Sequence, residues 1–307
     1  MSEGNQVEDK TAHTTKLNLW ATYASVGVAA VLILVKIYAW ILTDSVSLLS
    51  TLVDSLLDGA ASLITLLAVR HALQPADDEH RFGHGKAEPL AGLAQSAFIV
   101  GSALFLIFQS IERIAHPTDI LNPEIGYSVI VFSIAVTVGL VVFQRYVVRK
   151  SGSVAISADS LHYQTDVMIN GSVLVSIFLA SELGLTLADP IFAIGIALFI
   201  SYTAWKIGVE ALNILMDHEL SDEDRRKIIE IACSKDGIEG VHDLRTRSSG
   251  TQVFIQMHLE MDGNMPLRLA HEIADEVELK VGAEYPNSEV IVHQDPDHVE
   301  GLERQRV

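Results

Sequence analysis

Two aspartates interrupt a long apolar stretch near the N-terminus, which reads VSLLSTLVDSLLDGAASLITLLAV over residues 46–69. As a helix, the stretch is long enough to cross a hydrocarbon core of ~30 Å, so it predicts a membrane protein. Asp54 and Asp58 would then lie at membrane depth, where ionisable groups are expensive. Such groups usually face a bundle interior or an ion path.

A second apolar stretch, residues 154–180, carries the pair His162 and Asp166. Both pairs have i,i+4 spacing, which puts the two side chains of each pair on one helix face. Four oxygen and nitrogen ligands on two helices can form a tetrahedral metal cage. The alternative is that these groups are buried hydrogen-bonding partners that join helices. Because two matched pairs are present, we favour the metal site.

Six apolar runs are long enough to span a bilayer. They cover residues 17–42, 46–69, 90–114, 125–148, 154–180 and 187–216. A mean hydropathy of +0.32 with only 7% aromatic residues fits helices rich in Ala, Leu, Ile and Val, and no alternating pattern of barrel strands is present. We therefore expect a six-helix transmembrane domain over residues 17–216, preceded by a cytoplasmic N-terminal arm, residues 1–16.

The chain becomes polar and acidic after the sixth run. From residue 217 onward it holds 21 of the 39 acidic residues against 10 of the 21 lysines and arginines. We expect a cytoplasmic metal-binding domain over residues 217–300 and a short tail, residues 301–307. No basic patch for a nucleic-acid partner is present.

Basic residues in the short connections predict the orientation of the helices. Eight lie in the N-terminal arm and in the second and fourth connections, namely Lys10, Lys16, Arg70, Arg81, Lys86, Arg145, Arg149 and Lys150, whereas the other three connections hold only Arg113. Both termini are therefore expected in the cytoplasm. The polar N-terminus predicts no cleavable signal peptide, and a single cysteine, Cys233, fits a reducing compartment.

Two other groups of residues suggest metal ligands. The connection after the second helix contains Asp77, His80 and His84, although a polar loop of this kind is often simply solvated. The acidic domain reads as helix 222–235, strand 241–247, strand 253–261, helix 267–283 and a last strand. His242, His258, His293 and Asp295 can converge on one face of its sheet. Asp159 falls on the His162 face of its helix, and we expect it to be a solvated residue near the cytoplasmic mouth.

The chain resembles the cation diffusion facilitators along nearly its whole length. The likeness is carried, in order and spacing, by Asp54-Ser-Leu-Leu-Asp58, Pro75-Ala-Asp-Asp-Glu-His-Arg-Phe-Gly-His-Gly-Lys-Ala-Glu88, Asp159-Ser-Leu-His-Tyr-Gln-Thr-Asp166 and His293-Gln-Asp-Pro296. It implies a homodimeric exporter of the bacterial inner membrane, an α-helical membrane protein with a cytoplasmic α+β ferredoxin-like domain. It also implies Zn(II) as substrate and as a structural or regulatory ion, with no organic cofactor.

The resemblance assigns a role to each group of residues. Asp54, Asp58, His162 and Asp166 would form the transport site, and Asp77, His80 and His84 a second zinc site, weak and fast to exchange because its loop is in water. A zinc pair would lie at His242, His258, His293 and Asp295, supported by His271 and Gln294. Lys86 and Asp217 would form an interlocking salt bridge, and Leu161 a hydrophobic gate.

The ligand chemistry predicts a secondary active transporter, not an enzyme. Metal binding needs deprotonated ligands, so protons and metal compete for the same atoms. Three oxygens and one nitrogen suit Zn(II) over Mg(II) or Ca(II); Cd(II), Fe(II) and Co(II) stay open, and the histidine argues against a manganese specialist. A passive divalent-cation channel or a membrane-tethered sensor remains the alternative. The nearest string to a metalloprotease motif, His271-Glu-Ile-Ala-Asp275, lacks the second histidine.

Overall fold

A computed structural model describes residues 3–43, 46–115, 124–183 and 187–297. The expected tail, residues 301–307, lies outside this part. The chain divides into two compact units, one of residues 13–212 and one that contains residues 3–12, the start of the first helix, together with residues 213–297. Each unit is described by itself.

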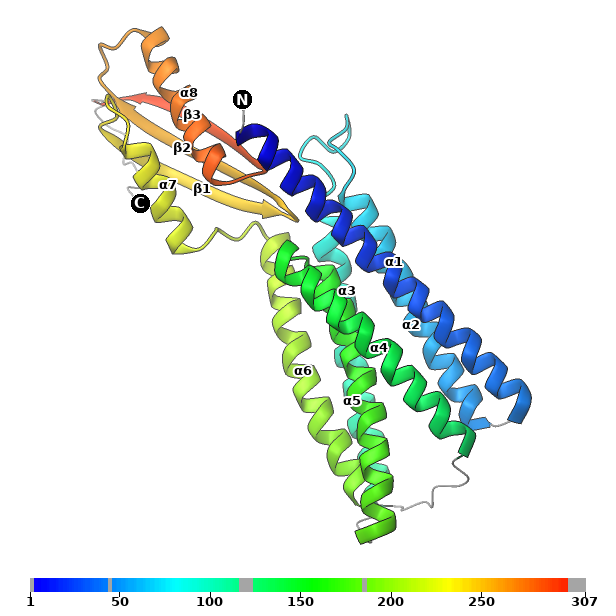
Figure 1. Cartoon of the computed structure of the whole chain (residues 1–307). Coiled ribbons are helices and arrows are strands. Elements are labelled where there is room, and N and C mark those ends of the chain that lie inside the picture. Colours follow the sequence, from blue (N-terminus) through cyan, green and yellow to red (C-terminus); the bar gives the residue numbers. More distant parts are fainter. Residues whose placement is uncertain (1–2, 44–45, 116–123, 184–186, 298–307) are drawn as a thin grey trace. The chain divides into compact units, whose positions relative to one another are not determined.

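The first unit is built from six long helices (Figure 1). They are α1 (Glu3–Thr43), α2 (Val46–Ala72), α3 (Ala87–Ala115), α4 (Glu124–Ser151), α5 (Val154–Leu183) and α6 (Ala188–Leu215). At a rise of ~1.5 Å per residue, each is long enough to cross a bilayer. The α1 helix begins at Glu3, so most of the expected N-terminal arm is helical.

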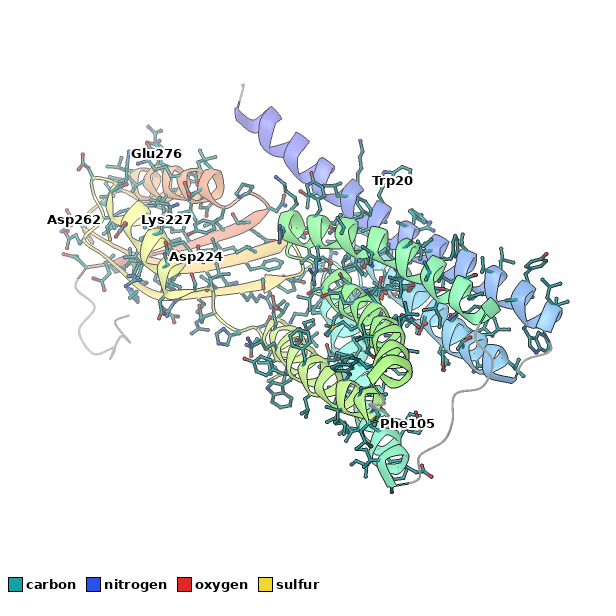
Figure 2. All side chains as sticks on the ribbon, turned by 60° about the horizontal axis from the view of Figure 1, so that its bottom comes forward. Trp20, Phe105, Asp224, Lys227, Asp262 and Glu276 are labelled. Atoms are coloured by element: carbon teal, nitrogen blue, oxygen red, sulfur yellow. The ribbon has the colours of Figure 1, made fainter. Side chains whose placement is uncertain are left out.

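Five of these helices combine the length and the apolarity of a membrane span within the described residues; α5 is the exception. It has the length, at 30 residues, but its first half contains Asp159, His162 and Asp166. Large apolar side chains elsewhere in the unit point outward. Trp20 on α1 and Phe105 on α3, labelled in Figure 2, are 67% and 61% exposed. Such surfaces are suited to lipid tails.

The polar helix α5 packs against α2, α3 and α4. Its contact with α3 depends on a glycine, because a Cβ added at Gly92 would lie 2.9 Å from Cγ1 of Val154. Ile156 and Tyr163 on α5 are almost fully buried. The helix that carries the ionisable residues is therefore shielded on several sides by its neighbours.

The second unit is a three-stranded sheet with two helices. Its elements are α7 (Asp222–Cys233), β1 (Gly240–Ser249), β2 (Gln252–Met261), α8 (Leu267–Glu284) and β3 (Ser288–Pro296). The order of helices and strands agrees with the sequence prediction. Strand β2 lies between the other two, antiparallel to β1 and parallel to β3.

The alternation of side chains along β2 separates a core face from a polar face. Ile255, Met257 and Leu259 are buried against apolar residues of α7 and α8. His258 falls between them in sequence and therefore points to the opposite face. The register places His242, His258 and His293 side by side across the three strands.

Candidate metal centres

The first candidate centre lies between α2 and α5. Nε2 of His162 lies 2.8 Å from Oδ1 of Asp58, and the two side chains are 11% and 21% exposed. Ligand atoms of Asp58, His162 and Asp166 all lie within 4.8 Å of one another. Two carboxylates and one imidazole at this spacing can hold one divalent metal ion.

The structure does not bring the fourth predicted ligand into this group. Asp54 lies one turn before Asp58 on α2 and is exposed. Leu161, the predicted gate residue, is 3% exposed and adjoins His162 on α5. The sequence pattern thus places Asp54 on the correct helix face, but three ligands form the compact cluster.

The expectation that Asp159 is solvated was wrong. Its side chain is buried, and its carboxylate accepts hydrogen bonds from four other helices. Ser62 Oγ donates at 3.0 Å, Gln95 Nε2 at 3.3 Å and Gln144 Nε2 at 2.7 Å, and Ser25 Oγ donates as well. Because these donors come from α1, α2, α3 and α4, Asp159 connects all of them to α5. Sequence periodicity gave its helix face but not the four polar partners.

A lysine near the membrane cluster was also missed by the sequence reasoning. Lys36 on α1 donates from Nζ to the backbone oxygen of Thr51 at 3.0 Å and to Oγ of Ser55 at 2.6 Å. The signal was present, because Lys36 is the only charged residue in the apolar run 17–42. An ionisable group in such a run marks a functional position by default.

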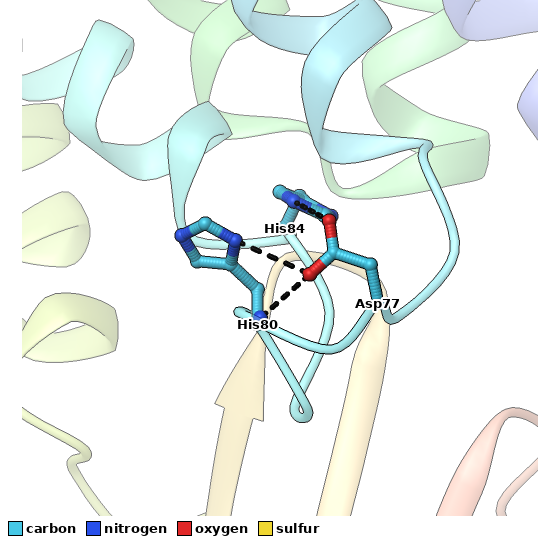
Figure 3. Close-up of side chains that lie close together, drawn as sticks. All are labelled: Asp77, His80 and His84. Atoms are coloured by element: carbon cyan, nitrogen blue, oxygen red, sulfur yellow. Dashed lines mark hydrogen bonds and ion pairs between the residues drawn. The ribbon is translucent and has the colours of Figure 1, made fainter.

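The second candidate centre is the connection between α2 and α3 (Figure 3). Oδ1 of Asp77 lies 3.4 Å from Nδ1 of His80, and its Oδ2 lies 3.3 Å from Nε2 of His84. The ligand atoms of these three residues lie within 4.8 Å of one another. The geometry therefore brings together all three residues that the sequence suggested.

This connection is more organised than a solvated loop would be. Oδ1 of Asp77 accepts hydrogen bonds from the backbone N–H of His80, at 2.6 Å, and of Glu79, at 3.0 Å. These bonds, the His80 bond above all, lower the pKa of Asp77 and so favour its ionised form. Gly83 has a φ of 75°, which lets the chain turn back, and His84 is buried. The connection therefore has internal hydrogen bonds, and the weak, fast-exchanging zinc site expected there stays a prediction.

The third candidate centre lies on the polar face of the sheet. Oδ2 of Asp295 lies 3.1 Å from Nε2 of His242 and 2.9 Å from Nδ1 of His258. Burial opposes ionisation of Asp295, but the hydrogen bond with His258 and the nearby histidines lower the pKa of this carboxyl. Two imidazoles and a carboxylate suit Zn(II). Glu260, on the same strand face as His258 but not predicted as a ligand, has Oε1 3.3 Å from Nδ1 of His242.

The other residues predicted for this centre lie outside the compact cluster of His242, His258 and Asp295. His293 Nε2 lies 3.3 Å from Oδ1 of Asp295, but its side chain is 65% exposed. Gln294 pairs with Leu259, on the core face of the sheet. His271 on α8 is exposed and faces Asp275, with 3.4 Å between Nδ1 and Oδ1. The alternation of strand residues explains why Gln294 and Asp295 point to opposite faces.

Comparison with known proteins decides the family. The cation efflux transmembrane domain matches residues 22–216, and the cation efflux protein cytoplasmic domain matches residues 220–297. The chain belongs to the cation efflux family. The cation-efflux pumps FieF of Salmonella choleraesuis (strain SC-B67) and Salmonella typhimurium (strain LT2) are each 53% identical over 276 residues, which is 90% of this chain and 92% of theirs.

A solved structure of the MamM CTD in its nickel form is also similar to this cation efflux protein. It has 25% sequence identity, covers 25% of this chain and 100% of that chain, and gives a TM-score of 0.25. As a member of the cation efflux family, the chain is a multi-pass membrane transporter of divalent metal ions with a cytoplasmic α+β domain, as the sequence predicted.

The predicted interlock between Lys86 and Asp217 joins residues of the two different units of the cation efflux protein. Lys86 precedes α3, where its backbone oxygen accepts from Leu90 N at 3.2 Å. Asp217 has a φ of 56°, and its Oδ2 lies 3.5 Å from Nη1 of Arg247. The pairing of Lys86 with Asp217 stays a prediction.

Proposed function

We propose that the protein exports Zn(II), with Cd(II) and Fe(II) as further substrates, from the cytoplasm in exchange for protons. The observation that carries the proposal is the cluster of Asp58, His162 and Asp166 on two helices of the transmembrane domain. Asp54 completes the proposed transport site, and closer packing of α2 and α5 around a bound ion would bring it in. Leu161 beside His162 is the proposed gate.

Competition between protons and metal at these atoms supplies the coupling. Carboxylates and a neutral imidazole bind metal, whereas protonation of the same groups releases it. If the site opens alternately to the two sides, metal loads where the proton concentration is low and leaves where it is high. This cycle drives efflux without nucleotide. Alternating access needs movement of α2 relative to α5, and the contact between Asp58 and His162 lies directly between them.

The donor set supports zinc and its neighbours over hard cations. The cluster offers carboxylate oxygens and one imidazole nitrogen, whereas Mg(II) and Ca(II) prefer oxygen ligands alone. Cd(II) and Fe(II) accept the same mixed set. His162 is thus the residue that disfavours purely oxygen-seeking ions.

The other two centres serve delivery and assembly in this proposal. Asp77, His80 and His84 receive metal on the cytoplasmic side, before the membrane site. His242, His258 and Asp295, with His293, bind zinc that stabilises a homodimer, and His271 and Gln294 lie outside this cluster. Residues 17–216 are assigned to transport, residues 217–300 to this regulatory domain, and both termini to the cytoplasmic side of the bacterial inner membrane.

Proteoliposomes test the proposal. Purified protein is reconstituted, and Zn, Cd, Fe, Mn and Co fluxes are measured with and without an imposed pH gradient. An antiporter accumulates Zn(II) and Cd(II) in the liposome lumen against their own gradients while protons leave the lumen. Metal uptake should therefore raise the pH of the lumen. The Asp58→Ala variant provides the matched inactive control.

Two results would contradict antiport. Metal flux that follows only its own gradient, at the same rate with and without the pH gradient, would identify a passive channel. Metal binding with no flux under either condition would identify a membrane-tethered sensor.

A further inference from the structure

Lys36 reaches from α1 to the α2 face that carries the metal ligand Asp58. Its Nζ donates to the backbone oxygen of Thr51 and to Oγ of Ser55. Thr51, Ser55 and Asp58 follow one another at i, i+4 and i+7, so they share one helix face. Ser55 is 2% exposed. The lysine side chain is therefore directed toward the transport site and away from lipid.

The charge of Lys36 acts on the acids that would bind the metal. Its attractive electrostatic partners are Asp58, Asp166 and Asp54. In a membrane interior such interactions are weakly screened and therefore strong. A divalent metal at the site would meet the same three carboxylates, and it would be repelled by the ammonium group.

Counting charges around the loaded site shows what the lysine changes. With metal bound, Asp54, Asp58 and Asp166 are deprotonated and His162 is neutral. Three negative charges, the ammonium charge and a divalent ion together give a net charge of zero. Without Lys36 a divalent ion would face the same three carboxylates with no competing cation nearby, so the ion would be held more tightly and released more slowly.

We propose that Lys36 is an internal counter-charge of the transport site, which weakens metal binding enough for release and matches the site to a divalent ion. The inference rests on the proposed transport function, since it assigns the transport site to these acids. Lys36 is a positioning and specificity residue in this role; it does not bind the metal.

A purely structural role for Lys36 makes the opposite prediction. If its hydrogen bonds to Thr51 and Ser55 only fasten α1 to α2, their loss should loosen α2 and weaken metal binding. If its charge matters, removal of the charge should tighten binding. The sign of the change in affinity therefore separates the two roles.

Calorimetric titration with Cd(II) and Zn(II) measures this sign in the full-length protein. The background carries Asp77→Ala and Asp295→Ala, so that the loop and cytoplasmic centres do not contribute. Lys36→Met should lower the Kd of the membrane site by about tenfold or more and slow metal release in proteoliposomes. Lys36→Arg, which keeps the charge, and Ser55→Ala, which removes only a hydrogen bond, should stay within about twofold of the background.

Several outcomes would overturn the inference. Weaker binding in both Lys36→Met and Ser55→Ala would show a structural tie, and an unchanged Kd in Lys36→Met would show that the charge is not felt. Lys36→Gln, neutral but able to donate to Ser55, replaces Lys36→Met if that variant does not fold. Asp58→Ala distinguishes failure of this inference from failure of the proposed transport function. If this variant binds metal as the background does, the proposed transport site itself is wrong.

Discussion

Nε2 of His162 lies 2.8 Å from Oδ1 of Asp58, and this contact joins α5 to α2 at the centre of the proposed transport site. A hydrogen bond between the two residues occupies the same atoms that a metal ion would bind. Metal loading must therefore replace the shared proton by the ion. Occupancy of the site and the packing of the two helices are linked through this pair.

Loss of either member of this pair should abolish transport. Asp58→Ala and His162→Ala each remove a ligand of the membrane cluster, so Zn(II) flux in proteoliposomes should fall to the level of empty liposomes while the protein stays folded. His84→Ala removes only a ligand of the loop centre and should lower the rate partly. Equal loss in all three variants would show that the transport site lies elsewhere.

Replacement of His162 by aspartate should change metal selectivity. A fourth carboxylate makes the site harder and more anionic, so Mn(II) uptake should rise relative to Zn(II) uptake. The pH profile of transport should also move, because the imidazole is gone. Competition between the two metals in proteoliposomes over a range of pH values measures both effects. An unchanged Zn(II) preference together with an unchanged pH profile would exclude His162 as a ligand.

Asp159 is expected to be important for stability more than for metal binding. In Asp159→Asn, an amide NH₂ replaces an oxygen that accepts from surrounding hydroxyl and amide donors, so at least one buried donor loses its partner. The free energy of unfolding should fall by about 1–3 kcal/mol. Unfolding in detergent measures the change, with the exposed Asp236→Asn as control. Stability equal to that of the control would contradict the network.

The cytoplasmic centre should make the stability of its domain depend on zinc. Zinc binds the folded centre and so raises the midpoint of thermal unfolding. In the His258→Ala/Asp295→Ala double variant this zinc-dependent rise should disappear, and zinc-dependent pairing of the cytoplasmic domains should disappear with it. His271→Ala, which changes a histidine outside the cluster, is the comparison. Undiminished zinc-dependent pairing in the double variant would count against this centre.

Asp295 should also give the metal-free protein a defined pH dependence. Its pKa is lowered in the folded state, so the unfolded chain binds the proton more readily. The resulting stabilisation is present above the unfolded value of ~3.9 and is lost as the pH falls through the lower folded value. The stability advantage of the wild type over Asp295→Asn, measured with chelator, should therefore shrink below about pH 4. An advantage that does not change with pH would show that ionisation of Asp295 is not responsible.

Local sequence patterns predicted the membrane helices, the order of elements in the cytoplasmic domain and the helix faces of the proposed metal ligands. These properties depend on local patterns: apolar run length, the i,i+4 spacing of His162 and Asp166, and the alternation around His258. Each pattern constrains its own segment. The family resemblance added the loop residues, which periodicity alone does not separate from a solvated connection.

The packing of the helices determines which of those residues lie together. Asp159 and His162 share a helix face, yet one binds donors from four helices and the other faces Asp58, because different neighbours pack at each level of α5. Lys36 donates a hydrogen bond to Ser55, 19 residues away in the chain. Helix periodicity fixes the direction of a side chain, whereas its partner depends on how separate helices pack.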